Sequence, residues 1–460
     1  MLCLVTTSQA LVIQATANLS FKNQIAALRD LLTRDFTEFW IYKDLFFSPS
    51  HIGATPKLIQ KSIANLGDRL RLRRLLINAF KGEDVSMPII GGSISRGAPF
   101  SEQGNGSRIY FHAIKNWWNT LFAGISGSKL IPKSVSLGGV GTDYFAFCLD
   151  SHLRQDFTPE LLIWELAAND RGRYKDMPFP PGQPLEQFIR NAMQRYSRPA
   201  LILLNFFRGA DVSETSCPNY EDEGGLAVAA HYNITSLSWR NYVCDYIQNK
   251  DLNFGKNNSF ALDNFHPSIL GHAQMAFIVI NYLRNEFLRT LKGPAGQTTN
   301  IEDFVRALSG DFYVLPRLMF PETSLEKPLC FTYFRYSCYE PNNTLAAQVT
   351  RQDNFKYNIF KQFVVRTDKL CGMQTDLAEQ MMQFTIYLPR SFSRLIVVSH
   401  SERGSAQLWL DRQTPVVMRT DDYHMGTLLK IVSTNLAPGR HVLNALSLKH
   451  GFVVCSIAVI

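Results

Sequence analysis

Residues 87–97 read Met-Pro-Ile-Ile-Gly-Gly-Ser-Ile-Ser-Arg-Gly, and this stretch decides the fold. Pro88 is expected to open a strand, because proline cannot donate a hydrogen bond to a central ladder. Ile89 and Ile90 are β-branched and apolar, as a strand covered on both faces requires. The glycines after them allow a tight turn and a close approach to another group. The stretch therefore predicts a buried strand that ends in a glycine turn, with Ser93 at its tip.

The position of this serine makes it a candidate functional residue. In sheets of parallel strands covered by helices, ligands bind beyond the carboxyl ends of the strands. A Gly-Gly-Ser turn is also common as a plain loop, so the interpretation of Ser93 depends on the residues at the ends of the other strands.

Four further apolar runs alternate with helical patterns downstream of this turn. They are Ser134–Leu137, Pro159–Leu166, Pro199–Asn205 and Ile234–Leu237, and a final helix is expected at Ser268–Leu291. Strands that alternate with helices predict a parallel sheet with both faces covered. Polar turns containing Gly138 and Asn169 come directly after two of these strands, so we expect them to meet Ser93 at one edge of the sheet.

The chain of 460 residues is too long for one ordinary domain. We expect a helical lead-in over residues 1–80, the α/β domain over 81–292, and a linker over 293–312, where glycine, proline and threonine are frequent. Short apolar runs separated by turn residues over 313–460 predict an antiparallel β-sandwich.

Four motifs succeed one another along the predicted α/β domain. They are Gly91-Gly92-Ser93-Ile94-Ser95-Arg96-Gly97, Ser136-Leu137-Gly138-Gly139-Val140-Gly141, Ala167-Ala168-Asn169-Asp170 and Asp263-Asn264-Phe265-His266-Pro267. In this order, over residues 86–291, they resemble the sequence blocks of the SGNH (GDSL-type) hydrolase family. The resemblance implies a three-layer α/β/α domain with a flavodoxin-like parallel sheet.

The resemblance also implies a serine esterase site. Ser93 would be the nucleophile, and a serine hydroxyl needs an adjacent base. His266 would accept its proton and return it to the leaving group. Asp263, three residues earlier, would orient the imidazole and stabilise its charged form. The oxyanion donors of the family correspond to the backbone N–H of Ser93, the backbone N–H of Gly138 and the side-chain amide of Asn169.

The motifs depart from the family pattern at three positions outside the reacting groups. Gly92 replaces an aspartate, Ser136 replaces an asparagine, and Ala167 replaces a glycine, which is expected to crowd the site and to alter substrate choice. The other two histidines near these motifs, His231 and His272, are expected to be packed or capping residues.

The residues of the motifs also suit purely structural roles. A histidine before a proline can cap a helix, and Asn169 and Asp170 would suit a helix N-cap. Arg96 and Arg171 flank the expected site in the sequence and would bind an anionic or sugar substrate, or simply lie on the surface.

These motifs favour hydrolysis of an ester through an acyl-serine intermediate. The C-terminal region, with Leu436-Ala437-Pro438-Gly439-Arg440-His441 before its last strands, is similar to jelly-roll carbohydrate-binding modules. Removal of O-acetyl groups from a glycan is therefore the first expectation for the reaction. The alternatives are an O-acyltransferase that uses the same site, and a non-catalytic glycan-binding or cell-surface protein on a decayed hydrolase fold.

Composition narrows the class of partner. The chain carries a formal net charge of +8, but no dense Lys/Arg cluster is interleaved with aromatic residues, which disfavours a nucleic-acid partner. No run is long and apolar enough to span a bilayer. None of the eight cysteines forms a Cys-x-x-Cys pair, which disfavours zinc, and no cofactor is expected. No oligomeric state is indicated.

The cellular location stays open between two interpretations. Asn-x-Ser/Thr triplets begin at Asn18, Asn105, Asn233, Asn257 and Asn342, which favours a secretory route. The segment Met1–Ala17 is a poor signal peptide, so the protein is either cytosolic or begins upstream of the given start. Four cysteines in the last third, namely Cys330, Cys338, Cys371 and Cys455, would suit a disulfide-stapled β domain.

Overall fold

The computed structural model describes most of the chain. The described residues are 19–34, 42, 49–100, 106–153, 158–172, 179–195, 198–213, 216–219, 225–309, 314–333, 348–353, 356–361, 369–400, 404–420, 426–449 and 452–460. Several positions of the sequence analysis lie outside these ranges, namely Met1–Ala17, Asn18, Asn105, Cys338 and Asn342. The acceptor residues Asn233 and Asn257 are described and exposed.

A mixed sheet of six strands forms the centre of the first half of the chain. The strands are β1 (Ile63–Asn65), β2 (Val85–Gly91), β3 (Leu130–Ser136), β4 (Leu161–Glu165), β5 (Ala200–Asn205) and β6 (Thr235–Ser238). Their order is β1-β6-β5-β4-β2-β3. The pairs from β6 to β3 are parallel, and the short edge strand β1 runs antiparallel to β6. The predicted parallel sheet is thus confirmed.

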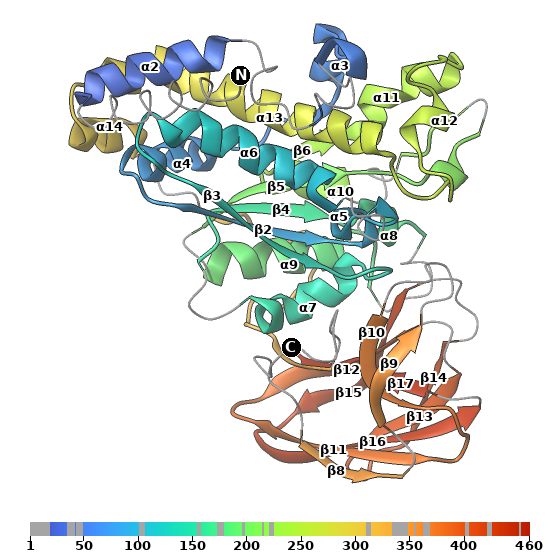
Figure 1. The fold of residues 1–460 in the computed structure, drawn as a ribbon. Coiled ribbons are helices and arrows are strands. Elements are labelled where there is room, and N and C mark those ends of the chain that lie inside the picture. Colours follow the sequence, from blue (N-terminus) through green and yellow to red (C-terminus); the bar gives the residue numbers. More distant parts are fainter. Residues whose placement is uncertain are drawn as a thin grey trace, which may run out of the picture.

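Helices lie on both faces of this sheet (Figure 1). On one face lie α6 (Tyr110–Ala123) and α13 (Ile269–Lys292), which contact each other. On the other face lie α7 (Thr142–His152) and α9 (Gln183–Arg195), which also form a pair. The other α-helices among the described residues of this half are α2 (Phe21–Thr33), α3 (Pro56–Lys61), α4 (Leu70–Phe80), α5 (Ser93–Arg96), α8 (Ala167–Asp170), α10 (Gly225–His231), α11 (Trp239–Gln248) and α12 (Lys256–Ser259).

The strand β2 begins three residues before the proline that was expected to open it. The backbone carbonyl of Ser86 accepts a hydrogen bond from the N–H of Glu160, on the edge of β2 that faces β4. Because hydrogen-bonding groups alternate along a strand, Pro88 faces the same edge. Pairing of β2 with β4 begins only at Ile89. Pro88 offers no N–H to β4, and the ladder between β2 and β4 begins directly after it, so the proline precedes this ladder although it lies inside the strand that pairs with β3.

Two of the expected segments contain secondary structure that the sequence analysis did not predict. The expected helical lead-in contains β1, which pairs with β6 and so belongs to the sheet. The expected linker contains a 3₁₀ turn at Pro294–Gln297 and helix α14 (Ile301–Leu308). Asn300 caps α14 by accepting the N–H of Asp303, and the buried Phe304 packs edge-on against two other phenylalanine rings of the core. The prediction of a linker rested on the frequent glycine, proline and threonine residues over 293–312 and therefore missed this short amphipathic helix.

The second half consists of antiparallel sheets. A five-stranded sheet has the order β14-β13-β16-β11-β8, and a four-stranded sheet has the order β15-β12-β18-β7. A third sheet contains β17-β10-β9. The strands are β7 (Leu329–Thr332), β8 (Gln348–Gln352), β9 (Lys356–Lys361), β10 (Lys369–Thr375), β11 (Met381–Leu388), β12 (Phe392–His400), β13 (Ser405–Leu410), β14 (Val416–Arg419), β15 (Thr427–Leu436), β16 (Gly439–Lys449), β17 (Phe452–Val454) and β18 (Ser456–Val459).

The four-stranded sheet is buried on both of its faces. In β12, Leu395 and Val397 join the core shared with the five-stranded sheet. The alternate residues Ile396 and Val398 instead join the hydrophobic core of the α/β half. Because side chains of a strand alternate between faces, each face of this sheet has its own apolar layer. This double burial explains the unbroken apolar run Leu395–Val398, and it joins the two halves through a continuous core.

The disulfides join different elements from those expected. Cys330 in β7 is bonded to Cys148 in α7, and Cys217 is bonded to Cys244. Cys455 is a buried free thiol. The pairing of Cys330 therefore links the β half to the α/β half, whereas the sequence favoured a staple within the β half. Spacing along the chain could not show that α7 and β7 lie together.

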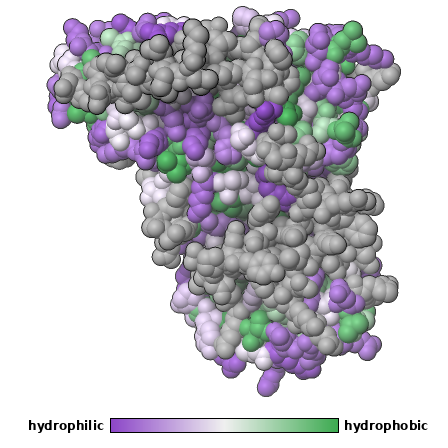
Figure 2. Space-filling view, in the orientation of Figure 1, coloured by the Kyte–Doolittle hydropathy of each residue, from purple (hydrophilic) through white to green (hydrophobic). Residues whose placement is uncertain are grey.

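The hydropathy of the surface and of the helices is relevant to a membrane partner. Hydrophilic residues cover most of the described surface in the view of Figure 2, and apolar residues lie in small separate areas. In the part of the chain that the structure describes, no helix combines the length and the apolar character needed to cross a membrane.

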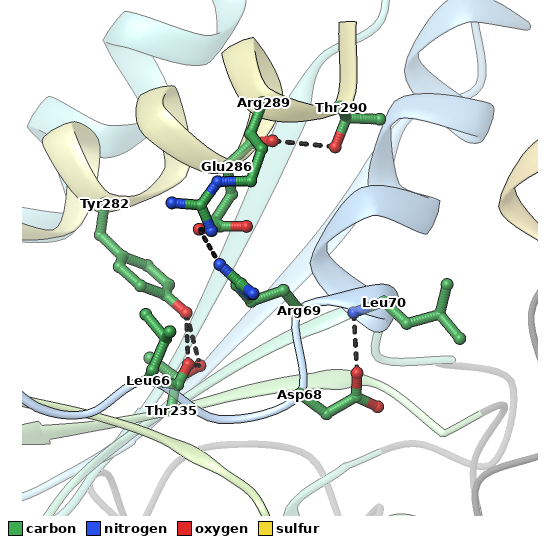
Figure 3. A network of polar contacts seen from close by, with 9 residues as sticks. All are labelled: Leu66, Asp68, Arg69, Leu70, Thr235, Tyr282, Glu286, Arg289 and Thr290. Carbon is green, nitrogen blue, oxygen red and sulfur yellow. Dashed lines mark hydrogen bonds and ion pairs between the residues drawn. The ribbon is translucent and has the colours of Figure 1, made fainter. Parts of the chain in front are cut away.

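A polar network fixes α13 to the segment between β1 and α4 (Figure 3). Glu286 on α13 is buried, and its carboxylate lies 3.4 Å from Arg69 and 3.0 Å from Arg289. One turn earlier, the hydroxyl of Tyr282 donates to the carbonyl of Leu66 at 2.7 Å. Burial raises the pKa of Glu286, and the charges of Arg69 and Arg73 oppose this shift. The helix after the Asp-x-x-His-Pro motif is thereby anchored at its far end.

Replacing Arg69 by alanine should destabilise the fold. The Glu286 carboxylate would stay buried and would lose its ion pair with Arg69, keeping the half-exposed Arg289 and the charge of Arg73 nearby. We expect a loss of about 1–3 kcal/mol in the free energy of unfolding, measured by chemical denaturation. Arg306→Ala is the matched control, because its pair with Asp303 is exposed and should contribute less than about 1 kcal/mol. Equal losses in the two variants would contradict the role of the network.

Candidate active site

Ser93 lies where the sequence placed it, just beyond the end of β2. The strand ends at Gly91, Gly92 is the N-cap, and Ser93 is the first residue of α5. The N–H groups in the first turn of a helix have no acceptor within the helix. Gly97 ends α5 with a φ of 89°, a left-handed conformation that glycine adopts without strain. The short helix thus holds the serine hydroxyl at the carboxyl edge of the sheet.

Three side chains from two distant segments form a continuous hydrogen-bonded chain. The Nε2 atom of His266 lies 2.7 Å from Ser93 Oγ, and its Nδ1 atom lies 2.6 Å from Asp263 Oδ2. The other carboxylate oxygen of Asp263 accepts the backbone N–H of His266 at 3.0 Å and that of Phe265 at 2.9 Å. The turn therefore fixes the carboxylate, and the carboxylate in turn fixes the imidazole ring.

The electrostatics of this turn keep Asp263 ionised. Partial burial would raise the pKa of this carboxyl, but the hydrogen bonds and charge of His266 outweigh it and lower the pKa to about 2. An ionised Asp263 accepts the Nδ1 hydrogen of His266, which leaves Nε2 unprotonated and able to accept a proton from Ser93.

The second and third motifs meet the first at the same edge of the sheet. The N–H of Leu137 donates to the carbonyl of Gly91 at 3.0 Å, which brings the turn containing Gly138 against the end of β2. The side-chain amide of Asn169 donates to the carbonyl of Val140 at 2.7 Å. An amide nitrogen carries two hydrogens, and this contact uses one of them.

Gly92 is required by the close approach of Asn169. A Cβ atom at position 92 would lie 2.2 Å from the side-chain nitrogen of Asn169. This distance is far below any normal contact, so an aspartate at this position would displace the amide. The departure from the family pattern at Gly92 is therefore coupled to the position of Asn169.

Asp170 joins the second motif to the third. Its carboxylate accepts the N–H of Thr142 at 2.8 Å and the Thr142 hydroxyl at 2.5 Å. The indole N–H of Trp164 donates to the same hydroxyl at 3.0 Å. Thr142 is the first residue of α7, so Asp170 fixes the start of this helix as well as the loop that precedes it.

A buried acidic network lies beneath the serine, and sequence reasoning missed it. Glu165 at the end of β4 accepts the N–H and the hydroxyl of Ser95 at 3.2 and 2.8 Å. The Ser95 hydroxyl also lies 2.8 Å from that of Tyr110. Burial raises the pKa of Glu165 to about 8, although the hydrogen bonds from Ser95 oppose this shift. The signal in the sequence is a single acid within the apolar run Leu161–Leu166.

The remaining candidates have other partners. His231 lies on the surface, and its Nε2 atom is 2.7 Å from the carbonyl of Arg317. His272 is buried and stacks on the ring of Tyr110. Burial lowers the pKa of His272 to about 3, so this ring is neutral at ordinary pH. His272 is thus a packed residue, as the sequence indicated, whereas His231 is an exposed residue that contacts a backbone carbonyl. Arg171 lies half-exposed at 3.0 Å from Asp211.

The arrangement can activate a serine hydroxyl by proton transfer. The nucleophile lies within hydrogen-bond distance of the base, and the base lies within hydrogen-bond distance of the orienting carboxylate. Nucleophilic catalysis needs this geometry. Among the described residues, no group of three or more His, Cys, Asp or Glu side chains is arranged to hold a metal ion.

Comparison with known proteins identifies the architecture. No protein-family model matches the chain, and no curated protein matches it. Two crystal structures of a two-domain esterase (CEX) active on acetylated mannans match, one of them co-crystallised with mannopentaose. Each has a TM-score of 0.61 and 17% sequence identity, and the match covers 87% of this chain and 97% of the esterase. The likeness shows a shared two-domain fold.

The protonated state of Glu165 should make stability fall as pH rises. The folded carboxyl has a pKa of about 8 and the unfolded one a value near 4.5, so the folded state holds the extra proton between them. The stabilisation is complete below the lower value and is lost as pH rises through the higher one. Glu165→Gln should flatten this decline, which is at most about 1.4 kcal/mol per pH unit, in melting curves between about pH 5 and 8.

Glu83→Gln is the matched control for this experiment, because Glu83 is exposed. Its melting temperature should track the wild-type pH dependence. An identical dependence in Glu165→Gln and wild type would show that the buried carboxyl does not hold a proton.

Gly92→Ala should displace the Asn169 amide and leave the core intact. The new methyl group would occupy the place of the amide nitrogen, so the reactivity of the site should fall by about 10²-fold. The rate at which Ser93 reacts with a fluorophosphonate measures this change. Gly225→Ala is the control, because the nearest atom to a Cβ there is at 3.9 Å. Equal rates in the two variants would refute the steric argument.

Proposed function

We propose that this protein is a serine esterase of the SGNH type. The observation that carries the proposal is the chain of contacts from Ser93 Oγ through His266 to Asp263, at 2.7 and 2.6 Å. The order of the four motifs supports the SGNH assignment. The first three motifs follow β2, β3 and β4 of the parallel sheet, and the fourth lies directly before α13.

The reaction would proceed in two steps. His266 Nε2 takes the proton of Ser93 while Oγ attacks the ester carbonyl, and the proton then passes to the leaving alcohol as the C–O bond breaks. Water then gives a proton to the same nitrogen and attacks the acyl-serine, and the bond between the acyl carbon and Oγ breaks as the proton returns to Oγ, which releases the acid and restores Ser93. A positioned base of this kind contributes about 10²–10⁴-fold to the rate. Asp263 stabilises the imidazolium that forms in each step.

Donors for the oxyanion would come from three loops. The backbone N–H of Ser93 lies in the first turn of α5, Gly138 comes after β3, and the Asn169 amide lies against Gly92. The contacts of Leu137 with Gly91 and of Asn169 with Val140 support their convergence. Loss of one such donor typically costs about 3–4 kcal/mol in the transition state.

The substrate class that we propose is an acetylated glycan. The similar two-domain esterase is active on acetylated mannans, and the fold is shared along both halves. We assign residues 81–292, together with β1, to a three-layer hydrolase domain of flavodoxin-like topology. Residues 313–460 are assigned to a jelly-roll-like β-sandwich, supported by two antiparallel sheets that share one apolar core.

Ser93→Ala and His266→Ala test the proposal. The purified wild type should react with a fluorophosphonate probe and release acetate from acetylated manno-oligosaccharides. Each variant should stay folded and lose turnover by roughly 10⁴-fold or more. Acetate released into water, without an acetylated second sugar, separates hydrolysis from acyl transfer.

Two surface variants serve as controls. His231→Ala and Ser309→Ala change the same residue types at exposed positions and should keep wild-type rates. Esterase activity that survives in Ser93→Ala would contradict the proposal, and so would a folded wild type that neither hydrolyses esters nor reacts with the probe.

A further inference from the structure

A strand of the β half, the antiparallel sheets from β7 to β18, contacts the loop of the second motif. The backbone N–H of Thr427, the first residue of β15, donates to the carbonyl of Gly139 at 3.3 Å. The Thr427 hydroxyl lies 3.5 Å from a carboxylate oxygen of Asp143, and both residues are buried. Gly139 is the residue directly after Gly138, the oxyanion donor in the proposed function. A strand of the other half therefore contacts the loop that supplies this donor.

The same face of the β half holds α7 farther along its length. The hydroxyl of Tyr144 lies 2.8 Å from that of Thr332 in β7, which lies 2.7 Å from the hydroxyl of Ser456 in β18. One turn later, Cys148 is bonded to Cys330. The loop after β3 runs directly into α7. A helix fixed along its length determines where the loop before it ends.

Apolar packing makes this contact rigid. In the four-stranded sheet, Ile396 of β12, Leu429 of β15 and Ala458 of β18 belong to the core of the α/β half. Figure 1 shows α7 directly against this sheet. Residues Thr142 to Leu149 of α7 are all buried. Close-packed interiors transmit displacement, so a shift of the sheet would reach the loop.

The loop itself has few side chains that could fix it. Three of its five residues, Leu137 to Gly141, are glycines, and Gly139 has a φ of 67°. Leu137 and Val140 are held by the α/β half, through Gly91 and Asn169. Gly139 lies between these two anchors, and Thr427 reaches it from the β half.

We propose that the β half is part of the catalytic apparatus, because Thr427 positions the oxyanion loop through its backbone N–H. Thr427 acts through Gly139 on the Gly138 donor and is a positioning residue. The inference rests on the proposed function and adds a role for the β half that is independent of glycan binding. Donors of this kind act chiefly on the transition state, so their displacement lowers kcat and leaves KM nearly unchanged.

Thr427→Pro is the direct test, because proline removes the N–H that Gly139 receives. The first residue of a strand tolerates proline, so β15 should form. We expect kcat on an acetyl ester to fall by about 10- to 100-fold, as for a displacement of about 1 Å, with KM within about 2-fold of wild type. The affinity for a trifluoromethyl ketone, which forms a tetrahedral adduct with the serine, should fall in parallel with kcat.

Leu408→Ala is the matched control for damage to the β half. Leu408 is buried in the core between the two antiparallel sheets and lies outside the core that includes α7. This variant should lower the melting temperature and keep kcat at a temperature where it is folded. Should Thr427→Pro fail to fold, Tyr144→Phe replaces it, because it removes the hydroxyl contact of α7 with β7 and keeps the ring.

The outcomes separate the inference from the function on which it rests. A wild type without esterase activity or probe reaction would overturn the proposed function and the inference with it. An active wild type, beside a folded Thr427→Pro or Tyr144→Phe variant with unchanged kcat and unchanged ketone affinity, would overturn the inference alone. A loss of kcat in Leu408→Ala equal to that in Thr427→Pro would also overturn it, because general destabilisation would then explain both.

Discussion

The site depends on two positions where a side chain is absent. At Gly91 a Cβ atom would lie 2.4 Å from the Ser95 hydroxyl and 3.2 Å from Glu165, and at Gly92 it would lie 2.2 Å from Asn169. The ends of β2 and β4 and the start of α5 can approach so closely only because both residues are glycine. This approach places the nucleophile, the buried acid and the side-chain amide within one small volume.

Two carboxyl groups near the serine, Glu165 and Asp263, have opposite protonation states. A carboxyl as buried as Glu165 is costly when ionised, and Ser95 and Tyr110 give it polar partners. Asp263, on the outer side of the histidine, keeps its charge because His266 and two backbone N–H groups stabilise it. Two carboxyl groups close to one serine thus differ in protonation because their surroundings differ.

Short-range relations in the sequence predicted which candidate residues lie together. Asp263 and His266 lie three residues apart, so one turn brings them together, and the turn after a buried strand located Ser93. The polar partners of Glu165 could not be predicted, because Ser95 and Tyr110 come from other elements. The parallel sheet was predictable from the alternation of strand and helix patterns.

Long-range contacts account for most of the features that the sequence did not reveal. The interior position of Pro88 depends on where β4 begins to pair, and the partner of Cys330 depends on the docking of the two halves. The apolar run in β12 has lost the alternation of a one-sided strand, because both faces of its sheet are covered. Each of these features records a neighbour that is distant along the chain.

The covering of α7 by the β half also sets an order for biosynthesis. Cys148 and Cys330 are separated by 182 residues, and β15 and β18, which pack on the same helix, come later still. At the usual pace of translation, roughly 10 to 40 s pass between the emergence of the two cysteines. During this time the α/β half exposes apolar surface that strands of the β half cover once they have been made.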